Sequence, residues 1–270
     1  MKIAFIGDSY CAHYKNKNNH WPGIVANKLN AEIIQTGFEG RPFYTAMQSF
    51  FKKMIDADIV ICCVTQPFRL HNRHNIPITP AWIRQMKAMR FECPSVGPDK
   101  YYDIEIPAKK VSTIAKAAHL YYTEICDEQE GYFSNISRIS YFDNLLKKNN
   151  KKVIWFPCFD DSFLWSSNWS EFSNTEYYIP VSGPSANISL YTIERARFIL
   201  SNPSVKEKDI DVMIANTDTD SNHFPIKENN ILAEIVLNII ENNKFSPDII
   251  IKMEEYFSYM DLSKACRVRE

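Results

Sequence analysis

Three residues of this chain have the types and the order that nucleophilic catalysis needs: Ser9 near the start, and Asp220 and His223 near the end. A serine hydroxyl is a poor nucleophile at neutral pH. It needs a base within hydrogen-bond reach, and that base must be oriented by a third group. An aspartate and a histidine three residues apart can form such an orienting pair from one loop. The chain therefore offers a nucleophile, a base and an orienting carboxylate.

The position of Ser9 depends on the apolar run at residues 3–6, which breaks into Gly7-Asp8-Ser9-Tyr10. A short apolar run followed by small polar residues indicates a buried strand that ends in a tight turn. In open α/β sheets the carboxyl ends of the strands face the ligand crevice, so a serine in this turn would face substrate. The alternative is a purely structural turn, because Asp and Ser are common cap and turn residues.

The remaining pattern predicts the elements that position these residues. Strand and helix patterns alternate over the first 65 residues, which is typical of a doubly wound α/β fold with a mostly parallel sheet. We predict strands at residues 3–6, 31–36, 59–64 and 152–158, helices at 21–29, 42–55, 107–127, 131–148, 189–200 and 229–240, and a lead into the last turn at 209–214. Residues 1–243 would form one domain, with an irregular and helical insertion around 66–150 and an aromatic loop at 160–185. Residues 244–270 would form a helical tail.

Composition narrows the class of protein. A net charge of −1 over 270 residues leaves no basic footprint for nucleic acid. Seven cysteines without paired spacing indicate buried small apolar residues rather than a disulfide framework, which fits a reducing compartment. The start of the chain has no apolar stretch long enough for a secretory signal, and no stretch reaches the roughly 20 apolar residues of a membrane span. We expect a soluble, cytoplasmic protein with no membrane partner.

The chain resembles the SGNH (GDSL-type) hydrolase family in four features. They are Gly7-Asp8-Ser9 after the first strand, glycine after the second, an Asp-led apolar third strand at residues 58–64, and Asp220-x-x-His223-Phe224-Pro225 near the end. The resemblance covers both ends and the first quarter of the chain. It implies a three-layer α/β/α sandwich and hydrolysis or transfer of an ester through an acyl-enzyme, with no metal or organic cofactor.

The resemblance also implies roles for particular residues. Ser9 is the nucleophile, His223 the general base and then acid, and Asp220 the group that orients His223. The oxyanion hole would use the Ser9 N–H, a glycine N–H after the second strand and an Asn side chain after the third. Gly40 is the better candidate glycine, with Gly37 as the alternative. Where the family has Gly-x-Asn this chain has Thr65-Gln66-Pro67, and Gln66 could donate in place of the Asn or could simply bind backbone.

Family analogy and the Asn- and Ser-rich aromatic loops favour an O-acetyl group on a carbohydrate as the substrate. Trp165 and Trp169 could stack on sugar rings or pack on the core. The alternative function is a catalytically impaired module of the same fold that binds a glycan or serves as a structural partner of another protein, which the missing Asn would suit.

Two further groups in the central region have competing interpretations. Arg69, Arg73 and Arg84 could recognise an anionic substrate, although loop arginines more often face solvent or pair with surface carboxylates. His71 and His74 could suggest a metal, but no Cys or carboxylate cluster stands near them, and a solvated loop is the more common case.

Overall fold

A computed structural model describes residues 1–13, 19–38, 40–51, 56–72, 76, 78–95, 105–158, 190, 224 and 226–243. Its centre is a four-stranded, all-parallel sheet in the order β2-β1-β3-β4. The strands are β1 (Lys2–Ile6), β2 (Glu32–Gln35), β3 (Ile59–Val64) and β4 (Lys152–Pro157). All four predicted strands are confirmed within a residue or two, and β1 lies inside the sheet, between β2 and β3.

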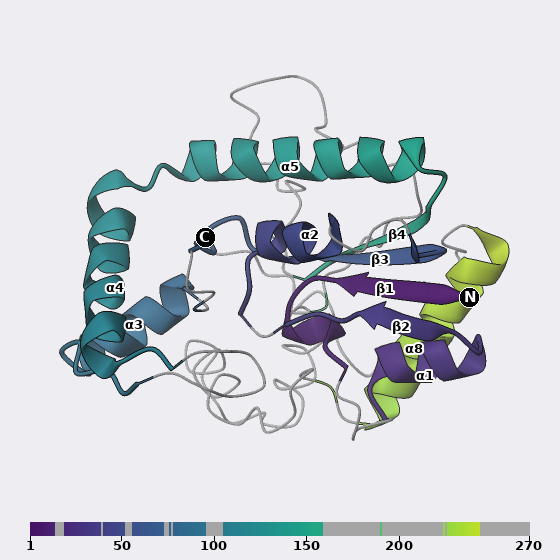
Figure 1. Cartoon of the computed structure of the whole chain (residues 1–270), viewed down its shortest axis with the longest axis horizontal. Coiled ribbons are helices and arrows are strands. Elements are labelled where there is room, and N and C mark those ends of the chain that lie inside the picture. Colours follow the sequence, from purple (N-terminus) through teal and green to yellow (C-terminus); the bar gives the residue numbers. More distant parts are fainter. Residues whose placement is uncertain are drawn as a thin grey trace, which may run out of the picture.

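Helices cover both faces of this sheet, and the protein is a three-layer α/β/α sandwich, as the sequence predicts (Figure 1). One face packs against α1 (Trp21–Lys28) and α8 (Ile226–Asn242), and the other against α2 (Phe43–Phe51) and α5 (Glu128–Lys148). Successive side chains of a strand point to opposite faces of the sheet. In β1, Ile3 and Phe5 point to the first face, and Ala4 and Ile6 point to the second. This double burial explains why β3 is apolar at every position.

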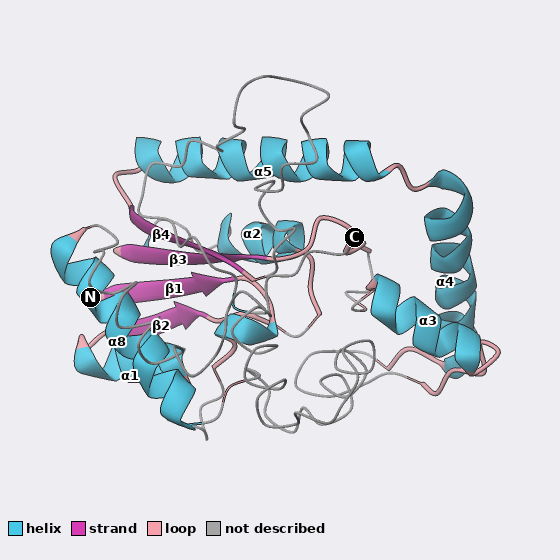
Figure 2. Cartoon of the chain, turned by 180° about the vertical axis from the view of Figure 1, so that it is seen from behind, coloured by secondary structure: helices cyan, strands magenta, loops and turns pink. Residues whose placement is uncertain are grey.

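The crossover from β3 to β4 contains a second, smaller packed unit. It includes α3 (Pro80–Ala88), α4 (Ala108–Leu120) and the π-helical turn η3 (Tyr121–Ile125). We call residues 70–125 the α3–α4 unit. It has its own apolar cluster, formed by Ile76, Ile78, Ile83, Met86, Cys93, Ile106, Val111, Ala115 and Ala118. Figure 2 shows α3 and α4 well away from the sheet, with α5 running back along it.

Two features of this crossover differ from the sequence prediction. Helix α3 lies in a stretch expected to be irregular, although Thr79 caps its first turn by accepting from the Trp82 N–H and Pro80 begins it, which are ordinary helix-start signals. Helix α5 lies in the segment expected to be an insertion, yet Ile139, Phe142 and Leu146 are fully buried against the sheet. It is therefore one of the helices that form the layer on this face of the sheet.

Several predicted segments lie outside the described residues. These are the aromatic loop at 160–185, most of the helix at 189–200, the lead at 209–214, the tail at 244–270 and residues 52–55 of the second helix. Of the helix at 189–200, only Leu190 is described, and it is buried in the core on the α1 and α8 face. Among the residues the structure describes, no helix has both the length and the apolar character needed to cross a membrane.

Candidate active site

Ser9 lies in a single 3₁₀ turn, η1 (Ser9–Cys11), directly beyond the carboxyl end of β1. Asp8 caps this turn, because its Oδ1 accepts the Tyr10 N–H at 3.2 Å. The residue is well enclosed, with 7% of the Ser9 surface exposed. The sequence expectation of a tight turn after the first strand is thus confirmed, and so is the cap function of the aspartate.

The backbone of this turn is fixed by its neighbours. Each carbonyl from residue 7 to residue 11 accepts a hydrogen bond, and three of the donors come from other segments. The pairs are Phe38 N–H to Gly7 at 3.2 Å, Cys11 N–H to Asp8 at 3.3 Å, Ala12 N–H to Ser9 at 3.0 Å, Trp21 Nε1–H to Tyr10 at 2.7 Å and Gly37 N–H to Cys11 at 3.1 Å. The loop after β2 and the first residue of α1 therefore hold Ser9 in place.

The two candidate oxyanion glycines have different environments. The Gly37 N–H is engaged by the Cys11 carbonyl, and a Cβ on Gly37 would lie 2.1 Å from the Asp8 carbonyl oxygen. Gly37 is thus a close-packing glycine. Gly40 has a φ of 65°, which favours glycine, and its N–H makes no hydrogen bond to another described residue. Of the two, only Gly40 has an N–H available to a ligand.

The end of β3 contributes two residues near this edge. Thr65 is buried, and its Oγ1 accepts the Phe43 N–H at 3.0 Å, so this side chain caps the start of α2. Gln66 is partly exposed, and its carboxamide makes no hydrogen bond to any described residue. Gln66 is therefore able to donate to a ligand, whereas the Thr65 hydroxyl is already engaged.

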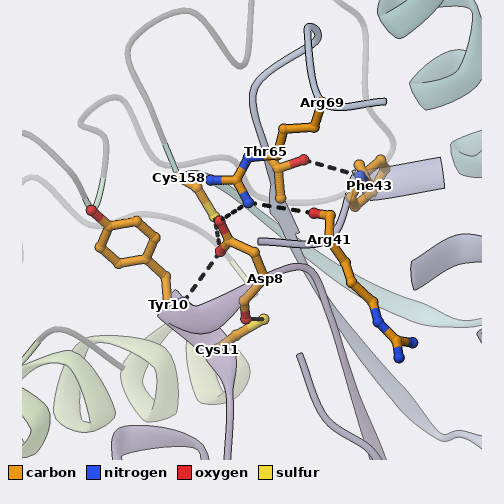
Figure 3. Close-up of polar contacts among 8 residues, drawn as sticks. All are labelled: Asp8, Tyr10, Cys11, Arg41, Phe43, Thr65, Arg69 and Cys158. Carbon is orange, nitrogen blue, oxygen red and sulfur yellow. Dashed lines mark hydrogen bonds and ion pairs between the residues drawn. The ribbon is translucent and has the colours of Figure 1, made fainter. Parts of the chain in front are cut away.

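A buried ion pair lies beneath the Ser9 turn, and it is the feature that sequence reasoning missed. Arg69 Nη1 is 2.7 Å from Asp8 Oδ2, and the two side chains are 7% and 0% exposed (Figure 3). The expectation of a solvent-facing or surface-paired Arg69 is wrong. The available signal was its position in the loop after β3, at the sheet edge where the Ser9 turn lies.

Asp8 joins the ends of three neighbouring strands. Its Oδ1 also accepts from the Cys158 Sγ at 3.4 Å, so β1, the β3 loop and the end of β4 all meet at one carboxylate. Burial, the largest cause, raises the pKa of the Cys63 and Cys158 thiols. All six described cysteines are free, and all except Cys126 are buried, which confirms for these residues the expected role as small apolar side chains.

Asp220 and His223 lie outside the described residues, but the chain is described again at Phe224. The Phe224 side chain is 2% exposed, and its ring centroid is 5.7 Å from that of Tyr10. Asn229, on α8, donates to the Phe224 carbonyl at 2.6 Å and accepts the Trp21 N–H at 2.8 Å. The residue after His223 in the chain therefore packs on the residue after Ser9.

The other candidate residues have simpler environments. His71 Nδ1 is 2.7 Å from Thr45 Oγ1, and burial and then the charge of Arg138 lower the pKa of this histidine. Arg84 lies exposed on α3. Within the described ranges, no three His, Cys, Asp or Glu side chains are grouped to hold a metal ion. Arg73, His74, Trp165 and Trp169 lie outside the described residues.

The fold and the site together define a parallel α/β/α sandwich with a serine turn at the carboxyl end of an inner strand. The loops after β2 and β3 border this turn. No family model, curated protein or solved structure matches the chain. What points to a function is therefore the sequence motifs and the geometry of the described residues.

Proposed function

We propose that this protein is a serine hydrolase of SGNH type that cleaves esters through an acyl-enzyme. The observation that carries the proposal is the packing of Phe224 on Tyr10. These residues are the chain neighbours of His223 and Ser9, and adjacent Cα atoms are about 3.8 Å apart. Phe224, the residue that follows His223, therefore lies at the carboxyl edge of β1. This supports the proposal that the two motifs supply a serine and its base to one site.

In the proposed reaction, His223 accepts the Ser9 hydroxyl proton as the serine oxygen attacks the ester carbonyl. The carbonyl π electrons move to oxygen, giving a tetrahedral oxyanion. The Ser9 N–H, the Gly40 N–H and the Gln66 carboxamide are its proposed donors. Collapse of this intermediate breaks the ester C–O bond, and His223 returns the proton to the leaving alcohol. Water then attacks the acyl-enzyme by the same steps, and Asp220 orients His223 throughout.

The proposed substrate is an O-acetyl group on a carbohydrate. A small acyl group suits an enclosed serine, and Ser9 is only 7% exposed. Fold analogy alone is a weak argument for a substrate, so the choice also rests on the polar and aromatic composition of residues 160–185.

A turnover panel tests this proposal. We expect acetylated sugars and p-nitrophenyl acetate to be hydrolysed, with turnover falling as the acyl chain of the p-nitrophenyl ester lengthens. Ser9→Ala and His223→Ala should each abolish turnover while the circular dichroism spectrum stays unchanged. Gln66→Ala should lower the turnover number by about 10²-fold, the usual effect of removing one oxyanion donor. Turnover that persists in Ser9→Ala would overturn the proposal.

A second candidate function is a glycan-binding module of the same fold without turnover. The observation that favours it is the end of β3, where Thr65 is engaged in capping α2 and no Asn is present. Saturable binding of an acetylated glycan by isothermal titration calorimetry, with the acetyl group intact after a long incubation, would support this function over hydrolysis.

A further inference from the structure

We infer that Arg69 is a positioning residue for the Ser9 reaction and that the α3–α4 unit holds Arg69 in place. This inference rests on the proposed function and extends it. Arg69 Nη1 contacts Asp8 Oδ2 at 2.7 Å and lies 3.4 Å from the Arg41 carbonyl oxygen. One guanidinium therefore joins the turn that carries Ser9 to the loop that carries Gly40.

The two segments that Arg69 joins are those that carry the proposed backbone oxyanion donors. Asp8 directly precedes Ser9, and Arg41 directly follows Gly40. The distance between two backbone N–H groups on separate loops is set by whatever ties the loops together. Oxyanion stabilisation depends on preorganised donors, and a misplacement of about 1 Å can cost about 10²-fold in rate. A fixed bridge between the loops meets that requirement.

Arg69 itself is held on both sides by the α3–α4 unit. Before it, the Phe68 carbonyl accepts a hydrogen bond from the Tyr122 hydroxyl, and the Phe68 ring lies against Gly131 of α5. After it, the Leu70 N–H donates to the Ile78 carbonyl at 3.0 Å. The small apolar core of α3 and α4 is therefore connected directly to the residue that reaches the Ser9 turn. The crossover from β3 to β4 therefore helps to hold Arg69 against the Ser9 turn.

Stability alone gives no reason for this ion pair. Removing two charges from water is unfavourable, and apolar side chains of similar volume often serve equally well in a core. What this ion pair adds is position: a single guanidinium nitrogen, Nη1, faces the Asp8 carboxylate and the Arg41 carbonyl at the same time, and so it relates the two loops to one another.

The experiment compares Arg69→Gln and Arg69→Lys with the wild type. The readouts are kcat and KM on p-nitrophenyl acetate and the rate at which a fluorophosphonate probe labels Ser9. We expect Arg69→Gln to lower kcat and the labelling rate by about 10²-fold, with KM changed less than about threefold. Arg69→Lys should recover part of the loss. Arg138→Gln, an exposed arginine on α5, is the matched control and should keep the wild-type rates.

A double variant separates positioning from folding. Asp8→Asn with Arg69→Gln removes both buried charges at once, so the fold is spared an unpaired ion. We expect a folded protein by circular dichroism whose kcat stays at least tenfold low. A folded Arg69→Gln or double variant with kcat within threefold of wild type would overturn the inference while leaving the hydrolase proposal intact. Absence of Ser9 labelling in the wild type would overturn both.

Discussion

Two loops leave neighbouring strands at the same edge of the sheet, and they are stabilised in opposite ways. The loop after β1, residues 7–12, is fixed by hydrogen bonds to its backbone carbonyls, which come from its own turn, from the backbone N–H groups of Phe38 and Gly37 and from the Trp21 indole N–H. The loop after β3, residues 65–70, is fixed mainly by contacts with the α3–α4 unit. Two of its side chains contact other segments: Thr65 caps the start of α2, and Arg69 pairs with Asp8.

The difference shows how the candidate site is divided between local and distant parts of the chain. The position of Ser9, the proposed nucleophile, is set by a short motif whose capping and tight packing follow from its own residue types. The environment of the Ser9 turn is set by Arg69, which lies 60 positions further along the chain. The loop that carries Arg69 is held in turn by Tyr122 of η3. We therefore expect substitutions to affect the two loops unequally, and four predictions test this.

The largest effect is expected at the junction of the two loops. Asp8→Ala leaves the Arg69 guanidinium buried without its partner, which should lower the free energy of unfolding by about 3–5 kcal/mol. Urea denaturation followed by circular dichroism measures it. Asp56→Ala breaks an exposed ion pair with Lys2 and should cost at most about 1 kcal/mol. A loss at Asp8 no larger than the loss at Asp56 would show that the pair does not join the loops.

The next effect concerns the glycine that lets the β2 loop approach the Ser9 turn. In Gly37→Ala the new Cβ would lie 2.1 Å from the Asp8 carbonyl oxygen, so backbone must move, and we expect a loss of about 3 kcal/mol or more. In Gly40→Ala the cost is that of a positive φ, about 1–2 kcal/mol. Unfolding in urea gives both values. The reverse order of the two losses would contradict the assignment of Gly37 as the packing glycine.

A smaller effect is expected from the contact that anchors the β3 loop. Tyr122→Phe removes the hydrogen bond to the Phe68 carbonyl and should lower the unfolding free energy by about 1 kcal/mol. Because Phe68 precedes Arg69, kcat should also fall by a few-fold. Tyr141→Phe, at an exposed tyrosine of α5, is the control and should change neither quantity. An unchanged kcat in Tyr122→Phe would show that this contact of the α3–α4 unit does not affect the Ser9 site.

The smallest effect is a pH dependence from the histidine that directly follows each loop, His13 after residues 7–12 and His71 after residues 65–70. Burial lowers the pKa of His13, and burial with the charge of Arg138 lowers that of His71, both from 6.5. Below that pH the unfolded chain binds more protons than the folded one, so stability falls as pH decreases. Thermal unfolding at pH 7.5 and 5.5 should show this, with a smaller difference in His13→Gln and His71→Gln. If both variants lose as much thermal stability between pH 7.5 and 5.5 as the wild type does, the lowered pKa values of His13 and His71 are contradicted.

The sequence predicted the sandwich because its signals are local. The continuous apolar runs of β1 and β3 define strands without reference to anything distant. The same holds for the Ser9 turn, where glycine, aspartate and serine have turn and cap preferences of their own. Gly40 remains a proposed oxyanion donor, and the structure adds that the Gly37 N–H is already engaged by the Cys11 carbonyl.

The Arg69 environment was not predictable in this way. An arginine in a polar, proline-rich loop has no local pattern that marks it as buried, and surface placement is the usual outcome. Its burial depends on Asp8 and on Tyr122, each more than fifty residues away. Helix α3 was missed for a different reason: its capping signals were present but short, among irregular neighbours. The contacts of Arg69 with residues far away in the sequence are therefore harder to predict than the helices and strands around the site.

The central claim is that Ser9 is an activated nucleophile, and covalent labelling of the folded protein tests it most directly. A fluorophosphonate probe, followed by peptide mapping by mass spectrometry, should modify Ser9 at one equivalent per chain. Labelling should be lost in Ser9→Ala and in His223→Ala. If the folded wild-type protein leaves Ser9 unmodified, or if His223→Ala is labelled at the wild-type rate, the account of this site as a serine hydrolase is contradicted.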